Sequence, residues 1–200
     1  MRFLIISHSK HKRKDGLLYG YAPYVNEMNL WLKHVDEVEV VAPEVFSPIT
    51  NIETAYKHEN LYFKPLDPIV FTSLKSAVIS MFSVPKICFK LFTACKKADH
   101  IHLRCPGNIG LLGCLVQIFF PKKIKTAKYA GNWDPDALQP ISYRFQKWVL
   151  SNTFLTKNMN VLVYGSWKNQ TKNIKSFFTA SYFKADCQTI KTRDYSGALK

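Results

Sequence analysis

Short, almost uninterrupted apolar runs recur along this chain and constrain its fold more than any other feature. They occupy residues 2–7, 38–43, 60–66, 100–104, 125–131 and 160–165. A strand inside a parallel sheet is covered on both faces, so its sequence is continuously apolar instead of alternating. The runs therefore predict strands of a buried parallel sheet. A weaker β-like run over residues 174–182 predicts one more strand.

The segments between these runs predict helices. Apolar residues at helical spacing mark residues 23–34, 73–97, 108–120 and 141–156, and we expect Pro85 to divide the second helix into two pieces. Strands that alternate with helices form a parallel sheet through right-handed crossovers, and 200 residues suit one domain. We therefore predict an α/β fold, a single Rossmann-like domain with a mostly parallel sheet and helices on both faces.

The charge of the chain is high and uneven. There are 28 Lys and Arg against 14 Asp and Glu, a net charge of +14, and residues 60–200 hold 21 of the basic residues but only six of the acidic ones. Such a field attracts phosphates, nucleic acid or an anionic membrane surface. No apolar run reaches the length of about 18 residues that a spanning helix needs, so we expect none.

The cysteines indicate the redox compartment. There are five, an odd number, and no two of them form a C-x-x-C pair. This pattern favours a reducing compartment and predicts no metal site. The apolar run at the N-terminus is too short for a signal peptide. We expect a cytoplasmic protein.

In an open parallel sheet, ligands bind beyond the carboxyl ends of the strands. That rule selects five loops as candidate sites, at residues 8–22, 43–58, 104–108, 131–140 and 165–173. G-x-G-x-x-G and Walker A motifs are absent from the sequence, which argues against nicotinamide enzymes and P-loop kinases.

The loop at 104–108 leads from a strand into a helix rich in small residues. The helix start at Asn108 would offer free N–H groups and the positive end of its dipole to an anion. Arg104 would add a planar fork of donors, and His102 lies on the same strand. We predict that these three residues bind substrate. The alternatives are that Pro106 and Gly107 form only a turn and that His102 is a core residue.

The loop at 131–140 carries Asn132 and Asp134, which we predict to contact a hydroxyl-rich substrate. Trp133 between them either faces a sugar ring or belongs to the core. The alternative for the whole loop is a solvated turn that begins a helix.

The loop at 8–22 is basic and aromatic. Lys10, Lys12, Arg13 and Lys14 are followed by the tyrosines of the same loop, Tyr19 and Tyr21. Basic residues beside aromatic ones bind nucleic acid through phosphate contacts and stacking, or lie on an anionic bilayer. We predict that the four basic residues face a membrane and that the two tyrosines contribute to substrate binding. A mobile solvated loop is the alternative.

The segment 86–97 predicts a basic amphipathic helix. Its lysines Lys86, Lys90 and Lys97 share one stripe, and a second stripe is apolar, with Ile87, Leu91, Ala94 and Cys95. Helices of this kind often rest on membranes, so we predict that these lysines face a membrane as well. A packed helix with a solvated basic face is the alternative.

These motifs, in their order, resemble the N-terminal acceptor-binding domain of GT-B glycosyltransferases of family 4. That family has a strand, a loop and a helix of small residues written D-x-x-H-x-H-x-P, matched here by Asp99, His102 and Pro106, with Arg104 at the place of the second His. Ser166 and Lys172 match a later strand that ends in Ser before a basic helix start. The resemblance covers residues 1–185, and 186–200 would be a linker to a C-terminal donor domain that this sequence does not contain.

The resemblance implies a fold that is one half of a GT-B enzyme. It implies a retaining glycosyltransferase that moves a sugar from a nucleotide sugar, its co-substrate, to a lipid-linked or other glycan acceptor. Ser166 would then bind substrate, no cofactor would be bound by this domain, and the isolated chain would be inactive. Where many members have a His after the fifth strand, this chain has Gly131–Asn132, so the catalytic residues are unidentified.

The partners that follow from this resemblance are the donor-binding domain, the acceptor and the inner face of the plasma membrane, which the chain would meet as a peripheral protein. Nucleic acid is not expected. Two other functions are open at this point, a non-catalytic partner of a glycosyltransferase and a basic nucleic-acid-binding module.

Overall fold

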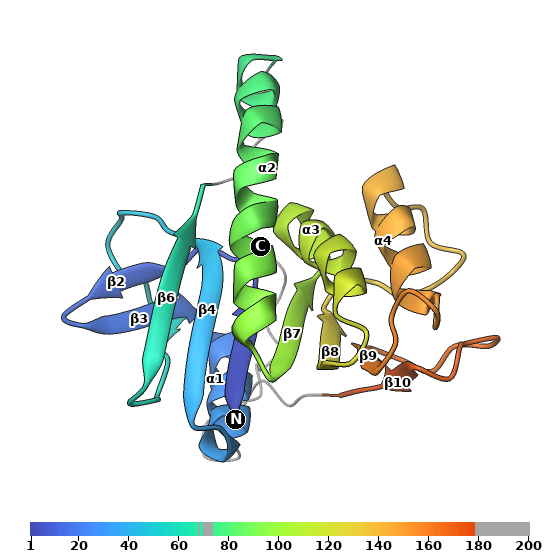
Figure 1. Cartoon of the computed structure of the whole chain (residues 1–200), viewed down its shortest axis with the longest axis horizontal. Coiled ribbons are helices and arrows are strands. Elements are labelled where there is room, and N and C mark those ends of the chain that lie inside the picture. Colours follow the sequence, from blue (N-terminus) through green and yellow to red (C-terminus); the bar gives the residue numbers. More distant parts are fainter. Residues whose placement is uncertain (68, 70–73, 179–200) are drawn as a thin grey trace, which may run out of the picture.

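The computed structural model describes residues 1–67, 69 and 74–178, and their side chains except those of 74–81. Seven strands form one sheet in the order β10-β9-β8-β7-β1-β4-β6 (Figure 1), and each neighbouring pair is parallel. The strands are β1 (Arg2–Ile6), β4 (Glu37–Pro43), β6 (Leu61–Leu66), β7 (His100–Cys105), β8 (Ile124–Tyr129), β9 (Met159–Val163) and β10 (Ile174–Ser176). The predicted α/β fold with a parallel sheet is confirmed.

Helices cover both faces of this sheet, as predicted. One face carries α1 (Ala22–Trp31), which continues into the short 3₁₀ helix η1 (Leu32–His34). The other face carries α2 (Leu74–Lys97), α3 (Asn108–Val116) with η2 (Gln117–Phe119), and α4 (Ile141–Ser151), which lie side by side in front of the sheet in Figure 1. The N-terminal half of α2 extends past the edge at which the strands end.

Each layer of helices has its own apolar core. On the α1 side, Val25 and Met28 pack with Phe3, Ile5 and Val40. On the other side, the apolar stripe predicted for α2 is buried together with strand residues and parts of α3 and α4, including Leu4, Ile6, Ile87, Leu91, Ala94, Cys95, Leu103, Cys114 and Val149. Successive strand residues point to opposite faces, so one strand supplies both cores.

A second, small sheet contradicts the prediction of an irregular loop over residues 8–22. It contains β2 (Lys12–Lys14), β3 (Leu17–Tyr21) and β5 (Glu53–Ala55), paired antiparallel. Asp15 and Gly16 form the connection with φ values of 50° and 76°. Asp-Gly favours a two-residue turn with positive φ at both positions, whose twist matches that of a hairpin.

Two helices differ from their predicted extent. Pro85 does not divide α2, which continues through it, because a proline removes only one backbone donor while Ile87 and Leu91 keep the following turns packed on the sheet. Helix α4 ends at Ser151 instead of 156. Asn152 leaves the helical conformation at φ −81° and ψ 105°, and its side chain accepts hydrogen bonds from the N–H groups of Phe154 and Leu155.

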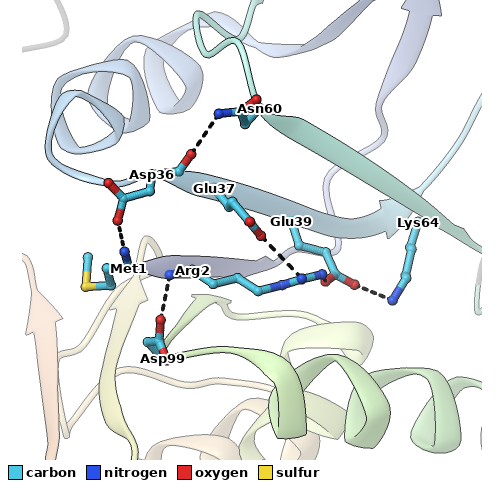
Figure 2. A network of polar contacts seen from close by, with 8 residues as sticks. All are labelled: Met1, Arg2, Asp36, Glu37, Glu39, Asn60, Lys64 and Asp99. Carbon is cyan, nitrogen blue, oxygen red and sulfur yellow. Dashed lines mark hydrogen bonds and ion pairs between the residues drawn. The ribbon is translucent and has the colours of Figure 1, made fainter.

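A polar network fixes the first residues of β1 to their neighbours (Figure 2). Arg2 donates from Nη2 to Glu39 Oε2 over 2.5 Å, and Lys64 Nζ lies 2.5 Å from Glu39 Oε1. Burial alone would raise the pKa of Glu39, but the hydrogen bonds from Lys64 and Arg2 lower it. Asp99 accepts from the N–H of Arg2 over 2.7 Å, so the start of β7 is held there too.

The proposed boundary at residue 185 and the linker 186–200 lie outside the described residues, as does the predicted last strand beyond residue 178. Its first part is present as β10. Among the described residues, no helix is long and apolar enough to cross a membrane.

Candidate functional site

The order of the strands creates a switch point between β1 and β7. After β1 the chain adds β4 and β6 on one side, and then crosses to the other side to add β7 and the strands that follow. The connections that leave β1 and β7 therefore diverge, which opens a crevice beyond their carboxyl ends. This is where a ligand site is expected in a doubly wound sheet.

A hollow of about 260 Å³ lies at this switch point. Both diverging connections contribute to it, and its lining includes His8, Lys10, Pro43, Gly107, Asn108 and Tyr143. A larger hollow, of about 590 Å³, lies at the opposite edge beside the starts of β8 and β9, at Ile124 and Met159. We take the switch-point hollow as the candidate site because ligands of open α/β sheets bind beyond the carboxyl ends of the strands.

Gly107 shapes the wall of the switch-point hollow. Its φ is 145°, a conformation that L side chains rarely adopt, and a Cβ built on it would lie 2.5 Å from the His8 ring. The two diverging connections therefore touch at this point. Only a residue without a side chain lets His8 approach the start of α3.

The start of α3 faces the hollow without a side-chain cap. Gly107 precedes the helix, and no side chain of the described residues caps it. Asn108 and Ile109, the first two residues of α3, line the hollow. The N–H groups of a first helical turn have no partner inside the helix, and the helix dipole makes this end positive. This end of the hollow suits an anion.

Arg104 brings a positive charge to the same edge from the α1 side of β7. Its guanidinium lies 4.0 Å from the centre of the Tyr24 ring. It is partly buried and has no carboxylate partner among the residues that the structure describes. A cation in this state gains from any anion that reaches it, because none of the described residues provides a counter-charge.

His8 is close to both Arg104 and Gly107, the residue before α3. Partial burial of the ring, together with the positive charge of Arg104, lowers the pKa of His8 below its usual value of 6.5. The imidazole is therefore neutral at pH 7, and its ring nitrogens offer one donor and one acceptor to a ligand. The sequence analysis did not select His8, although only Ser7 separates it from the end of β1.

His102 does not belong to this site, so the prediction that it binds substrate is corrected. The side chain is completely buried on the α1 side of β7, where its ring centre lies 5.2 Å from that of Trp31 and 5.8 Å from that of Phe3. Its Nδ1 is 2.8 Å from Thr126 Oγ1. Burial lowers the pKa of His102 to about 3, so it stays neutral.

The residues predicted after β8 and β9 lie at the same edge of the sheet, because these strands are parallel neighbours of β7. Asn132 Oδ1 accepts from the N–H of Asp134, and Asp134 Oδ1 accepts from the N–H of Asp136, each over 2.9 Å. Both side chains thus shape their own loop, as the solvated-turn alternative predicts. Ser166 is exposed. None of the three lines the switch-point hollow.

Trp133 belongs to the core, which settles the alternative left open for it. It is 5% exposed, and its ring stands edge-on to Tyr129 with centres 4.9 Å apart. It is therefore not free to lie against a sugar ring. Tyr19 and Tyr21, also predicted to bind substrate, lie on β3 in the small sheet, away from the lining of the switch-point hollow.

The basic loop is largely committed to contacts within the fold. Lys12 is 7% exposed and donates to Glu53 over 2.7 Å and to Pro48 O over 2.6 Å, so the prediction that it faces a membrane is wrong. Arg13 is paired with Glu44 through two hydrogen bonds of 2.6 and 2.9 Å. Lys10 and Lys14 are exposed.

The predicted lysines of α2 lie on its outer side. Lys86 is 3.4 Å from Asp67 in an exposed ion pair, and Lys90 donates to Pro65 O over 2.9 Å. Lys97 is exposed near the end of the helix. In the described part of the chain, no group of three or more His, Cys, Asp or Glu is arranged to hold a metal ion.

Comparisons with known proteins leave the family of this chain undefined. No protein-family model matches it, and no curated protein matches it. Among solved structures it is similar to UDP-GlcNAc 2-epimerase from Methanocaldococcus jannaschii, at 12% sequence identity and a TM-score of 0.39, over 79% of this chain. The match covers 41% of the epimerase, so the chain spans less than half the length of that protein. The description of the fold rests on its own topology.

Proposed function

We propose that this chain is the acceptor-binding half of a GT-B glycosyltransferase, and that the acceptor carries a phosphate group which binds at the switch point. The observation that carries the proposal is the guanidinium of Arg104, which has no carboxylate partner among the described residues, at the same edge as the start of α3, which no described side chain caps. Family 4 membership and retention of configuration are part of this proposal and rest on the motif resemblance.

The charges around the crevice favour a phosphate over a neutral ligand. Arg104 offers a planar fork of donors, Lys10 lines the hollow, and the first turn of α3 adds backbone N–H groups. Phosphate oxygens accept several such bonds at once, and each charge-assisted bond is worth about 1.5–3 kcal/mol. The net charge of +14 raises the local concentration of anions around the whole chain.

A phosphate anchor has a mechanistic purpose in sugar transfer. The hydroxyl that reacts must be held against the anomeric carbon of the donor sugar, and binding energy from a remote group supports that orientation. In this proposal the chain orients the acceptor, and a donor-binding domain joined to it holds the nucleotide sugar, which is the co-substrate. A lipid-linked glycan is the acceptor that meets both the phosphate and the membrane expectations.

Sugar transfer tests the proposal directly. The purified chain is incubated with radiolabelled nucleotide sugars and extracted lipid-linked saccharides, alone and together with a GT-B donor-binding domain supplied as a separate chain. We expect transfer by the combination and none by the chain alone. Turnover by the chain alone would contradict the division into halves, and no transfer with any nucleotide sugar would contradict the proposal.

The same assay separates the alternative of a non-catalytic partner. A glycosyltransferase that is complete and active without this chain, and is only stimulated by it, would assign the chain that role. The basic nucleic-acid-binding module is less supported, because Lys12 and Arg13 of the basic loop are already bound by carboxylates.

A further inference from the structure

The layer formed by α2, α3 and α4 has an unusual composition. None of these three helices contains an Asp or Glu, and between Asp67 and Asp134 the only acidic residue of the chain is Asp99. The same layer and its turns carry basic side chains that are exposed or partly exposed, namely Lys86, Lys90, Lys96, Lys97, Lys122, Lys123 and Arg144. The three helices of this layer are therefore positive, and the exposed ion pair of Lys86 with Asp67 offsets one of these charges.

Large aromatic side chains are exposed on the same layer. Phe82 is 81% exposed and Phe89 71%, and they lie seven residues apart on α2. Residues at this spacing lie on one side of a helix, opposite the buried stripe of Ile87 and Leu91. Phe119 of η2, also 71% exposed, lies beside α2, because its ring centre is 6.2 Å from that of Phe92.

Helix α4 repeats this pattern in the same layer. Its exposed apolar residues follow a spacing of four and three, which is one side of a helix, and they are Ile141, Phe145 and Trp148. The rings of Phe145 and Trp148 stack with their centres 5.8 Å apart. Scattered exposed apolar residues are normal, but aromatic stripes on two neighbouring outer helices indicate a surface that meets an apolar partner.

The opposite side of the molecule is different. There some of the basic residues are paired with carboxylates, as in Lys12 with Glu53 and Arg13 with Glu44, while Lys10 and Lys14 are exposed. Glu27 of α1 is buried in an ion pair with Lys128. The chain thus has one side with partly compensated charge and one side, the α2–α4 layer, that is positive and aromatic.

We propose that the α2–α4 layer docks on an anionic lipid bilayer. Aromatic rings enter the boundary between headgroups and acyl chains, and lysines reach the lipid phosphates while their methylene stems cover apolar surface. Exposed phenylalanines among lysines, on helices that contain no acidic side chain, fit this partner better than a protein surface, since protein interfaces are depleted in Lys. The proposal goes beyond the switch-point site and stands whether or not that site binds a phosphate.

Vesicle binding tests the proposal with the full chain. Co-sedimentation is measured with phosphatidylcholine vesicles and with vesicles that also contain phosphatidylglycerol. A lysine near an anionic surface contributes about fivefold in affinity, so Lys86→Gln with Lys90→Gln should weaken binding by about 25-fold. Phe89→Ala with Phe119→Ala should weaken it by tenfold or more, because both rings lose apolar contact. These residues are exposed, so the variants are expected to fold.

Matched controls lie outside the layer. Lys14→Gln with Lys57→Gln removes two exposed charges near the small sheet, and Phe46→Ala removes a ring that is 92% exposed after β4. Both controls should bind the anionic vesicles as the unchanged chain does. Three results would overturn the proposal: equal binding to neutral and anionic vesicles, layer variants that bind like the controls, or displacement from the vesicles by single-stranded oligonucleotide at physiological salt. A self-association that Phe89→Ala abolishes would instead assign the layer to a second copy of the chain, and would overturn it too.

Discussion

Acidification should destabilise this protein mainly through two buried histidines. His102 is completely buried and His11 nearly so, and burial lowers their pKa values to about 3 and about 4. In the unfolded chain both return to their usual pKa of 6.5. A group whose folded pKa is depressed binds protons in the unfolded state first, so the free energy of unfolding falls as the pH falls below 6.5.

The size of this loss follows from the pKa values. At pH 5, both imidazoles are still neutral in the folded chain but protonated in the unfolded chain. This pH lies about 1.5 units below their unfolded pKa of 6.5. At 1.36 kcal/mol per unit this is about 2 kcal/mol for each histidine and about 4 kcal/mol for both. The lowered pKa values of His8 and His100 act in the same direction. The lowered pKa values of Glu39 and Glu53 add to the loss only as the pH approaches their usual value of 4.5.

The variant His102→Leu isolates one of these contributions. Leucine keeps the apolar contacts with Phe3 and Trp31 and cannot be protonated. Urea unfolding at pH 8 and pH 5 should show a loss of at least about 4 kcal/mol for the unchanged chain, and a loss smaller by about 2 kcal/mol for the variant. His34→Gln, at an exposed histidine of η1, is the matched control and should lose as much as the unchanged chain. If His102→Leu loses as much as the control, the burial of a neutral imidazole in this core is refuted.

Two further stability predictions concern a glycine and a carboxylate. Gly107→Ala should lower the free energy of unfolding by about 3 kcal/mol, because the added Cβ meets the His8 ring and the positive φ is strained for alanine. Gly16→Ala, at a positive φ with open space around it, should lower it by only about 1 kcal/mol. Equal losses would contradict the contact between Gly107 and His8. Glu39→Ala should lower the free energy of unfolding by about 2 kcal/mol, because it leaves Arg2 and Lys64 without their shared carboxylate. Glu37→Ala, which removes a longer and more exposed ion pair with Arg2, should lower it by about 0.5 kcal/mol. Urea unfolding near pH 7 checks both pairs, and a reversed order within the second pair would show that Glu39 does not hold the strand ends.

The sheet could be predicted because its strands are buried on both faces and therefore read as apolar runs. Val38, Val40 and Val41 of β4 and Ile101 and Leu103 of β7 are completely buried. The hairpin at 12–21 was missed because Lys12, Arg13 and Lys14 read as a solvated basic loop. Its signal was the Asp15–Gly16 dipeptide, which fits a tight turn between two strands.

The site could be predicted only in part. The strand-to-helix connection predicted Arg104 and Asn108; the structure places Asn108 in the lining of the switch-point hollow and Arg104 near the carboxyl end of β7, outside that lining, and their binding of substrate stays a prediction. His102 was wrongly assigned to the site, because the sequence places a residue on one side of a strand without showing what covers that side. His8 was missed because its contact with Gly107 joins residues about one hundred positions apart. Such a contact depends on strand order, which apolar periodicity does not encode.

Binding of a short-chain polyprenyl phosphate, measured by calorimetry, tests the central claim that the switch-point crevice binds a phosphate-bearing acceptor. Arg104→Gln should weaken binding by about 10- to 100-fold, the loss of one or more charge-assisted hydrogen bonds. Lys33→Gln, which removes an exposed lysine of η1, should leave affinity within about twofold. If the Arg104→Gln variant keeps its fold by circular dichroism and binds the polyprenyl phosphate as tightly as the unchanged chain, a phosphate site at Arg104 is contradicted.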